Sequence, residues 1–76
     1  MYKTSDLYWA AFLRVSGIQL KGTEREYQKV IFLFEDPGGT IIQDLKGDFF
    51  MDRAKVSPLS FSQSLKALKA LIHQTS

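Results

Sequence analysis

The 76-residue sequence contains no cysteine and only one histidine. The absence of cysteine excludes disulfide bonds, thiolate zinc sites, iron–sulfur clusters and a cysteine nucleophile, and it fits a reducing compartment. The single histidine, His73, lies near the C-terminal end of the sequence, where helices fray and an orienting partner for a general base is hard to hold. The sequence also lacks a Gly-x-Ser-x-Gly elbow. It therefore predicts no catalytic residue, no cofactor and no enzymatic activity.

Long apolar runs and a strong excess of one charge are also missing. No segment approaches the roughly 18 apolar residues of a membrane helix, and the first residues do not resemble a secretion signal. We therefore expect a soluble, cytoplasmic protein. Ten Lys and Arg residues stand against eight Asp and Glu residues, which leaves a net charge of +2. So small an excess neither requires nor excludes nucleic acid as a partner.

Residues 30–34 are five consecutive apolar residues, each of which is β-branched, aromatic or leucine. The turn sequence Asp-Pro-Gly-Gly follows at residues 36–39, so the pattern predicts a strand closed by a turn. Successive strand side chains point to opposite faces, and here both faces carry apolar residues. We expect this strand to be central in a sheet that is covered on both sides.

Two further strands are expected. Ile18 and Leu20 alternate with polar residues over residues 18–21, which predicts an edge strand. A short polar connection at residues 22–28 joins it to the central strand, so the two should pair antiparallel. A short third strand is expected at residues 54–56.

Three helices complete the expected fold, and their expected bounds are residues 6–15, 41–50 and 58–73. Thr4 or Ser5 is expected to cap the first helix and Gly17 to end it. Ser57 followed by Pro58 is a strong start signal for the last helix. The order helix, strand, strand, helix, strand, helix predicts one α+β domain over residues 1–76 with a three-stranded sheet.

Two motifs could hold a ligand but have an ordinary structural explanation. Asp44, Asp48 and Asp52 are spaced by four, as carboxylates on one helix face around a hard cation would be. Asp52 is expected to lie beyond the end of the helix, however, so we interpret the row as solvated surface and predict no metal site. Residues 36–40 place glycines between a strand and a helix, but they match no phosphate-loop pattern and predict a turn.

A basic edge on the last helix is the candidate nucleic-acid contact. Lys66 and Lys69 lie on one side of this helix together with His73, and Arg53 and Lys55 precede it. These side chains could contact phosphates. The alternative is the solvated outer face of an amphipathic helix.

Tyr8, Trp9 and Phe12 are the candidate protein interface. They belong to a first helix that is apolar nearly all round, and such a helix is either deeply buried or exposes part of its surface to a partner. Trp and Tyr are enriched in interface anchors, but in so small a domain a core position is the favoured explanation of Trp9. Both interpretations stay open.

The chain resembles a family of small bacterial and phage-borne proteins that is catalogued only as a domain of unknown function. The resemblance rests on residues 2–8, on 10–13 with Gly17 and Leu20, on Phe32 and Phe34, and on the closing segment 61–71. It implies an α+β fold and a bacterial or phage setting, and it brings no catalytic residues.

Two functional hypotheses follow. The first is a non-enzymatic protein-interaction module, acting on a protein partner or on itself as a homodimer through the first helix or an exposed edge strand. The second is a nucleic-acid-binding accessory protein of a phage or mobile element that uses the basic edge of the last helix. Neither predicts a small-molecule substrate or a membrane partner.

Overall fold

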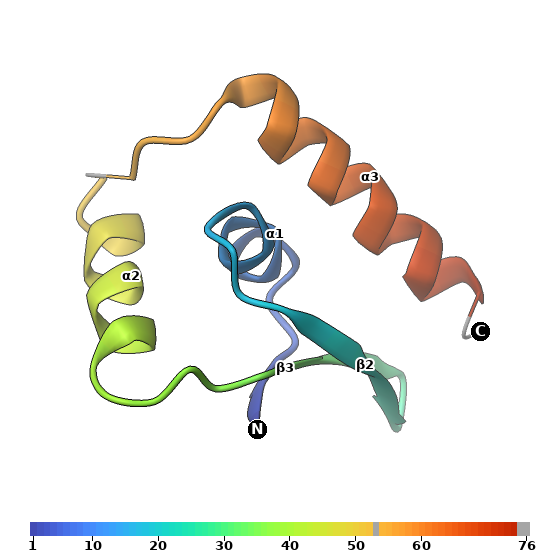
Figure 1. Ribbon diagram of the computed structural model, residues 1–76. Coiled ribbons are helices and arrows are strands. Elements are labelled where there is room, and N and C mark those ends of the chain that lie inside the picture. The colour runs from blue at the N-terminus through green and yellow to red at the C-terminus, as the bar shows by residue number, and fades with distance from the viewer. Residues whose placement is uncertain (53, 75–76) are drawn as a thin grey trace.

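The described residues, 1–52 and 54–74, form three strands and three helices in the computed structural model. The elements and their bounds are β1 (Tyr2–Thr4), α1 (Leu7–Val15), β2 (Leu20–Glu26), β3 (Lys29–Phe34), α2 (Ile41–Phe50) and α3 (Pro58–Gln74). Figure 1 shows α1 end-on between α2 and α3, above the sheet. The α+β class expected from the sequence is confirmed.

The sheet has the order β1-β3-β2, and β3 pairs antiparallel with both neighbours. The prediction that residues 30–34 form the central strand is therefore confirmed. The third strand, however, is β1 at the start of the chain, where Tyr2 pairs with Phe34 and Thr4 with Phe32. So short a segment becomes a strand because β3 offers it hydrogen-bonding partners, which no local pattern reveals.

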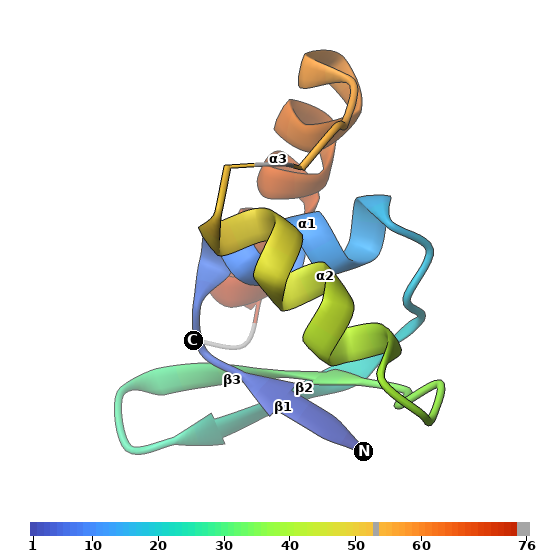
Figure 2. The same ribbon diagram turned by 90° about the vertical axis from the view of Figure 1, so that its left-hand side faces the viewer.

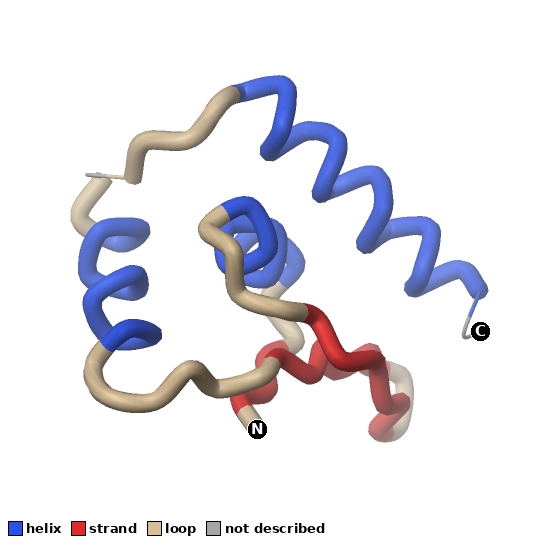
Figure 3. The backbone as a smooth tube through the Cα atoms, in the orientation of Figure 1, coloured by secondary structure: helices blue, strands red, loops and turns tan. Residues whose placement is uncertain are grey.

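The third strand expected at residues 54–56 is not formed. These residues belong to the connection between α2 and α3, drawn as a tan tube in Figure 3. Ala54 and Val56 are partly buried against the core from this connection. Their apolar character therefore reflects packing against the helices and not strand pairing.

The hairpin of β2 and β3 is longer than the sequence predicts. The sequence predicts a connection over residues 22–28. The structure has only a turn of Tyr27 and Gln28 there, because Glu26 already pairs with Lys29. The polar residues 23–26 form a strand since they lie at the edge of the sheet, where side chains can reach water.

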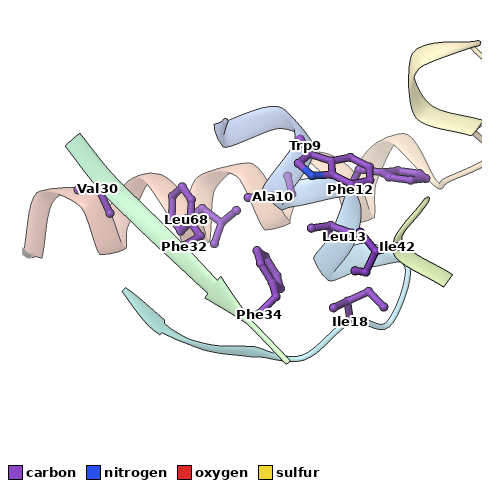
Figure 4. Packing of buried hydrophobic residues seen from close by; sticks show 11 residues of the cluster. Trp9, Ala10, Phe12, Leu13, Ile18, Val30, Phe32, Phe34, Ile42 and Leu68 are labelled. Atoms are coloured by element: carbon purple, nitrogen blue, oxygen red, sulfur yellow. The ribbon is translucent and has the colours of Figure 1, made fainter. Parts of the chain in front are cut away.

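The helices cover only one face of the sheet, as Figure 2 shows. Val30, Phe32 and Phe34 are buried beneath them, and Figure 4 shows these side chains among those of α1 and α3. Ile31 and Leu33 on the other face are only partly buried. The expectation that both faces are covered is therefore wrong. On the open face, Lys3 Nζ lies 3.1 Å from Glu24 Oε1, which pairs charges of the two outer strands.

Helix α1 begins and ends through local hydrogen bonds. Asp6 is its N-cap, and Oδ1 accepts from the backbone N–H of Tyr8 at 3.0 Å and of Trp9 at 3.1 Å. The expected cap at Thr4 or Ser5 is therefore wrong by one or two positions. Gly17 ends the helix as expected, with φ of +95°. The N–H of Ile18 donates to Leu13 O at 3.0 Å, which is the Schellman arrangement.

The core forms around α1, in which five consecutive residues from Trp9 to Leu13 are buried. Leu13 lies near Phe34 of β3 and Ile42 of α2, and Leu68 of α3 packs toward Phe32 (Figure 4). Each large side chain buried here contributes on the order of 2 kcal/mol by leaving water. A helix that is apolar nearly all round is thus accommodated within one chain.

Helices α2 and α3 follow the sequence expectations closely. Helix α2 has the expected bounds, and Thr40 is its N-cap residue without making a side-chain cap bond. Thr40 Oγ1 instead donates to Asp44 Oδ2 at 3.1 Å. Helix α3 begins at Pro58 as expected and runs one residue further than predicted.

Candidate functional site

The structure places the three candidate interface residues of α1 in different environments. Trp9 is 2% exposed and Phe12 is 3% exposed, so both are core residues of this chain. The Trp9 ring packs against Phe12 and Phe49, and its Nε1 donates to the Tyr2 hydroxyl at 2.9 Å. Tyr8 remains exposed. Of the three, only Tyr8 can reach a partner without opening the fold.

Exposed apolar surface is present at the end of α2. Phe50 is 60% exposed and Met51, directly after the helix, is 64% exposed. The Phe50 ring centroid lies 6.1 Å from that of Trp9, so this exposed ring rests on the aromatic part of the core. Adjacent large apolar residues in water are the kind of surface that a protein partner covers.

The row of aspartates and the glycine-containing segment 36–40 form no ligand site among the described residues. Asp52 follows the C-cap residue Met51 and has φ of +58°, so it does not continue the row begun by Asp44 and Asp48. Within residues 1–52 and 54–74, no group of three or more acidic or histidine residues is arranged to hold a metal ion. Asp36 closes its turn by accepting from the N–H of Gly38 at 2.9 Å.

The basic edge of α3 is exposed as expected. Lys66, Lys69 and His73 are all exposed, and their spacing of three and four places them along one side of the helix. Lys55 precedes α3, at the opposite end of a 17-residue helix from His73, and this helix is about 25 Å long. Arg53 lies outside the described residues. Lys55 therefore cannot share a small ligand with His73.

The basic edge of α3 leads toward the hairpin. A hollow of about 340 Å³ lies between the end of the hairpin and the last turn of α3. Arg25 and Lys29 contribute to it from β2 and β3, and His73 from α3. Among the described residues that line it, none carries a carboxylate. Figure 1 shows the C-terminal end of α3 on the same side of the molecule as this end of the hairpin.

The chemistry of this hollow combines positive charge with an apolar wall. Val30, Phe32 and Ile72 line it beside the cationic side chains, and Ser5 and Gln28 add hydrogen-bonding groups. Guanidinium and ammonium groups on low-dielectric walls attract anions more strongly than they do in open water. The hollow therefore suits an anionic group attached to a flat or apolar one.

A second hollow of about 750 Å³ adjoins the first around the hairpin turn. Both hollows are lined by Ser5, Gln28 and Lys29. The second also includes Tyr27, Ile31 and Glu26, so it contains a carboxylate and an aromatic ring at the hairpin turn. The two hollows thus differ in charge while sharing one lysine.

Arg25, Tyr27 and Lys29 are the surface residues that sequence reasoning missed. They are about 40 positions away from Lys69 and His73 in the chain, and only the fold brings the hairpin and α3 together. A signal was present in the sequence, because Tyr27 is a lone aromatic residue between two basic ones in an otherwise polar segment.

Three helices packed on one face of a three-stranded antiparallel sheet define a small α+β domain. This chain belongs to the family described as domain of unknown function DUF5659, whose model matches residues 1–74. The match confirms the expected resemblance to a domain of unknown function. No curated protein and no solved structure matches the chain.

Membrane association through a spanning helix has no basis in the part of the chain that the structure describes. None of its helices has both the length and the apolar character needed to cross a bilayer.

Proposed function

We propose that this domain is a non-enzymatic binding module whose ligand is a nucleic acid strand. The observation that carries the proposal is the hollow between the hairpin and α3, where the fold brings Arg25, Lys29 and His73 together. Lys69 and Lys66 extend this surface along α3. Regularly spaced phosphates are the anions that such an extended row fits.

We also propose a cytoplasmic location and, from the family resemblance, a phage or mobile element as the source of this domain. The charge involved is small, since the chain has a net charge of only +2. The binding is therefore expected to be weak at physiological salt and strongly salt-dependent.

The test is fluorescence anisotropy with a labelled oligothymidine of about 20 nucleotides, long enough for one small binding site. Each phosphate contact adds about −0.7 to the slope of log affinity against log salt, so three contacts give a slope of about −2. Affinity should then fall about twentyfold between about 50 and about 200 mM salt. Lys29→Gln and Lys69→Gln should each weaken binding and reduce the magnitude of the slope by about 0.7.

The matched control is Lys46→Gln, because Lys46 is an exposed lysine on α2, across α1 from α3. It should leave affinity and slope unchanged. Absence of binding at the lowest salt, or an equal loss in the Lys46 variant, would contradict the proposal.

Self-association is a second candidate function, and the exposed pair Phe50 and Met51 favours it. If a second copy covers this surface, light scattering should show a molar mass that rises with concentration, and Phe50→Ser combined with Met51→Ser should abolish the rise. A wild-type monomer at every concentration would rule this candidate out. Neither substitution touches the hollows around the hairpin.

A further inference from the structure

Tyr27 occupies a position in the hairpin that folding alone does not explain. Its side chain is 93% exposed, so it adds almost nothing to the core. Its φ is +56°, in the left-handed region that glycine and asparagine adopt easily and a tyrosine does not. The chain therefore holds an exposed aromatic ring on a strained backbone, and strained residues cluster at functional sites.

The hollow beside Tyr27 has the composition of a site for a flat ring. Tyr27 and Ile31 supply apolar surface, and Gln28 supplies an amide that can donate and accept hydrogen bonds. Glu26 in the same hollow would repel a phosphate but can accept a hydrogen bond from a ring N–H or an amino group of an unpaired base. The Glu26 carboxylate thus favours a base over a phosphate in this hollow.

Lys29 connects the two hollows, because it lines both. A nucleotide whose base lies on Tyr27 can therefore place its phosphate toward Lys29 and Arg25. Successive nucleotides would continue toward His73 and the lysines of α3.

We infer that Tyr27 stacks on an unpaired base and that the ligand of this domain is single-stranded nucleic acid. The inference rests on the proposed function and adds to it the choice between single strand and duplex. In a duplex both faces of every internal base are covered by its neighbours, so Tyr27 has no face to stack on. Aromatic stacking of this kind tolerates any base sequence.

The experiment compares the labelled oligothymidine with a duplex of equal length, for the wild type and three variants. Tyr27→Gly should weaken single-strand binding about tenfold, the loss expected for one stacking ring. Glycine accepts the positive φ, so this variant should be at least as resistant to urea as the wild type, and lost binding cannot then result from unfolding. Tyr27→Phe keeps the ring and should keep the affinity.

The matched control is Tyr8→Ala, because Tyr8 is also an exposed tyrosine. Alanine is used in place of glycine since Tyr8 lies on a helix, which glycine would destabilise. It should bind as the wild type does. Equal affinity for duplex and single strand, or unchanged binding by Tyr27→Gly, would overturn the inference. Lys29→Gln would still lose affinity in that case, so the proposed function would stand. No binding of either nucleic acid by the wild type would overturn both.

Discussion

Among the residues that the structure describes, Ser64 is the one buried polar residue, and its hydroxyl is poorly accommodated. The residue is 8% exposed on α3, and its Oγ has no hydrogen-bond partner within the described part of the chain. A buried hydroxyl without a partner loses its hydration without compensation.

Replacing this serine should stabilise the protein. Ser64→Ala removes the unpaired hydroxyl and raises helix propensity, so the free energy of unfolding should rise by about 1 kcal/mol in urea denaturation. Ser62→Ala is the control, because Ser62 is exposed on the same helix and gains only the propensity term. A decrease in stability for Ser64→Ala would show that the hydroxyl has a partner in solution.

Residue types alone did not reveal the hairpin turn. Tyr27 and Gln28 are neither glycine nor asparagine, so the segment lacked the usual hairpin signal and was interpreted as a longer connection. Gly17 was predicted correctly because its left-handed conformation follows from the local end of a helix.

At the scale of elements, β1 is held by both the sheet and α1. Tyr2 pairs with Phe34, its ring makes an edge-on contact with Trp9 at 6.5 Å, and its hydroxyl accepts from Trp9 Nε1. A three-residue strand has few backbone bonds of its own. The side-chain bond to α1 therefore carries much of its attachment.

Removing the hydrogen bond between Trp9 and Tyr2 should show how much it stabilises the packing of β1 on α1. Tyr2→Phe keeps the ring but leaves the indole N–H of Trp9 without its acceptor, so the free energy of unfolding should fall by about 1–2 kcal/mol in urea denaturation. Tyr8→Phe, at a tyrosine that is 57% exposed, should change it by less than about 0.5 kcal/mol. Equal effects of the two substitutions would mean that the bond contributes nothing.

The elements that could be predicted are those with local signals. Helices α2 and α3 begin where Thr40 and Ser57 indicate, and β3 is apolar throughout. Strand β1 could not be predicted, because its three residues become a strand only through pairing with β3, some 30 positions away. The apolar residues 54–56 were misinterpreted for the same reason: burial against helices and burial in a sheet leave similar patterns in a short segment.

At the scale of the whole molecule, half of the candidate surface could be predicted and half could not. Lys66 and Lys69 follow from helical spacing, which is a local property. Arg25 and Lys29 join them only because the sheet and α3 meet at one end of the fold. Arg53 and Lys55 were grouped with the start of α3 by nearness in sequence, and whether Lys55 contacts a nucleic acid stays a prediction.

The position of Trp9 has a spectroscopic consequence for the whole molecule. It is the only tryptophan, and its ring lies against Tyr2 of β1, Phe12 of α1 and Phe49 and Phe50 of α2. Its emission wavelength therefore reports whether β1, α1 and α2 are packed together, without any attached dye. None of the described ring contacts of Trp9 involves Tyr27, so the same signal can follow unfolding while a ligand occupies the hairpin.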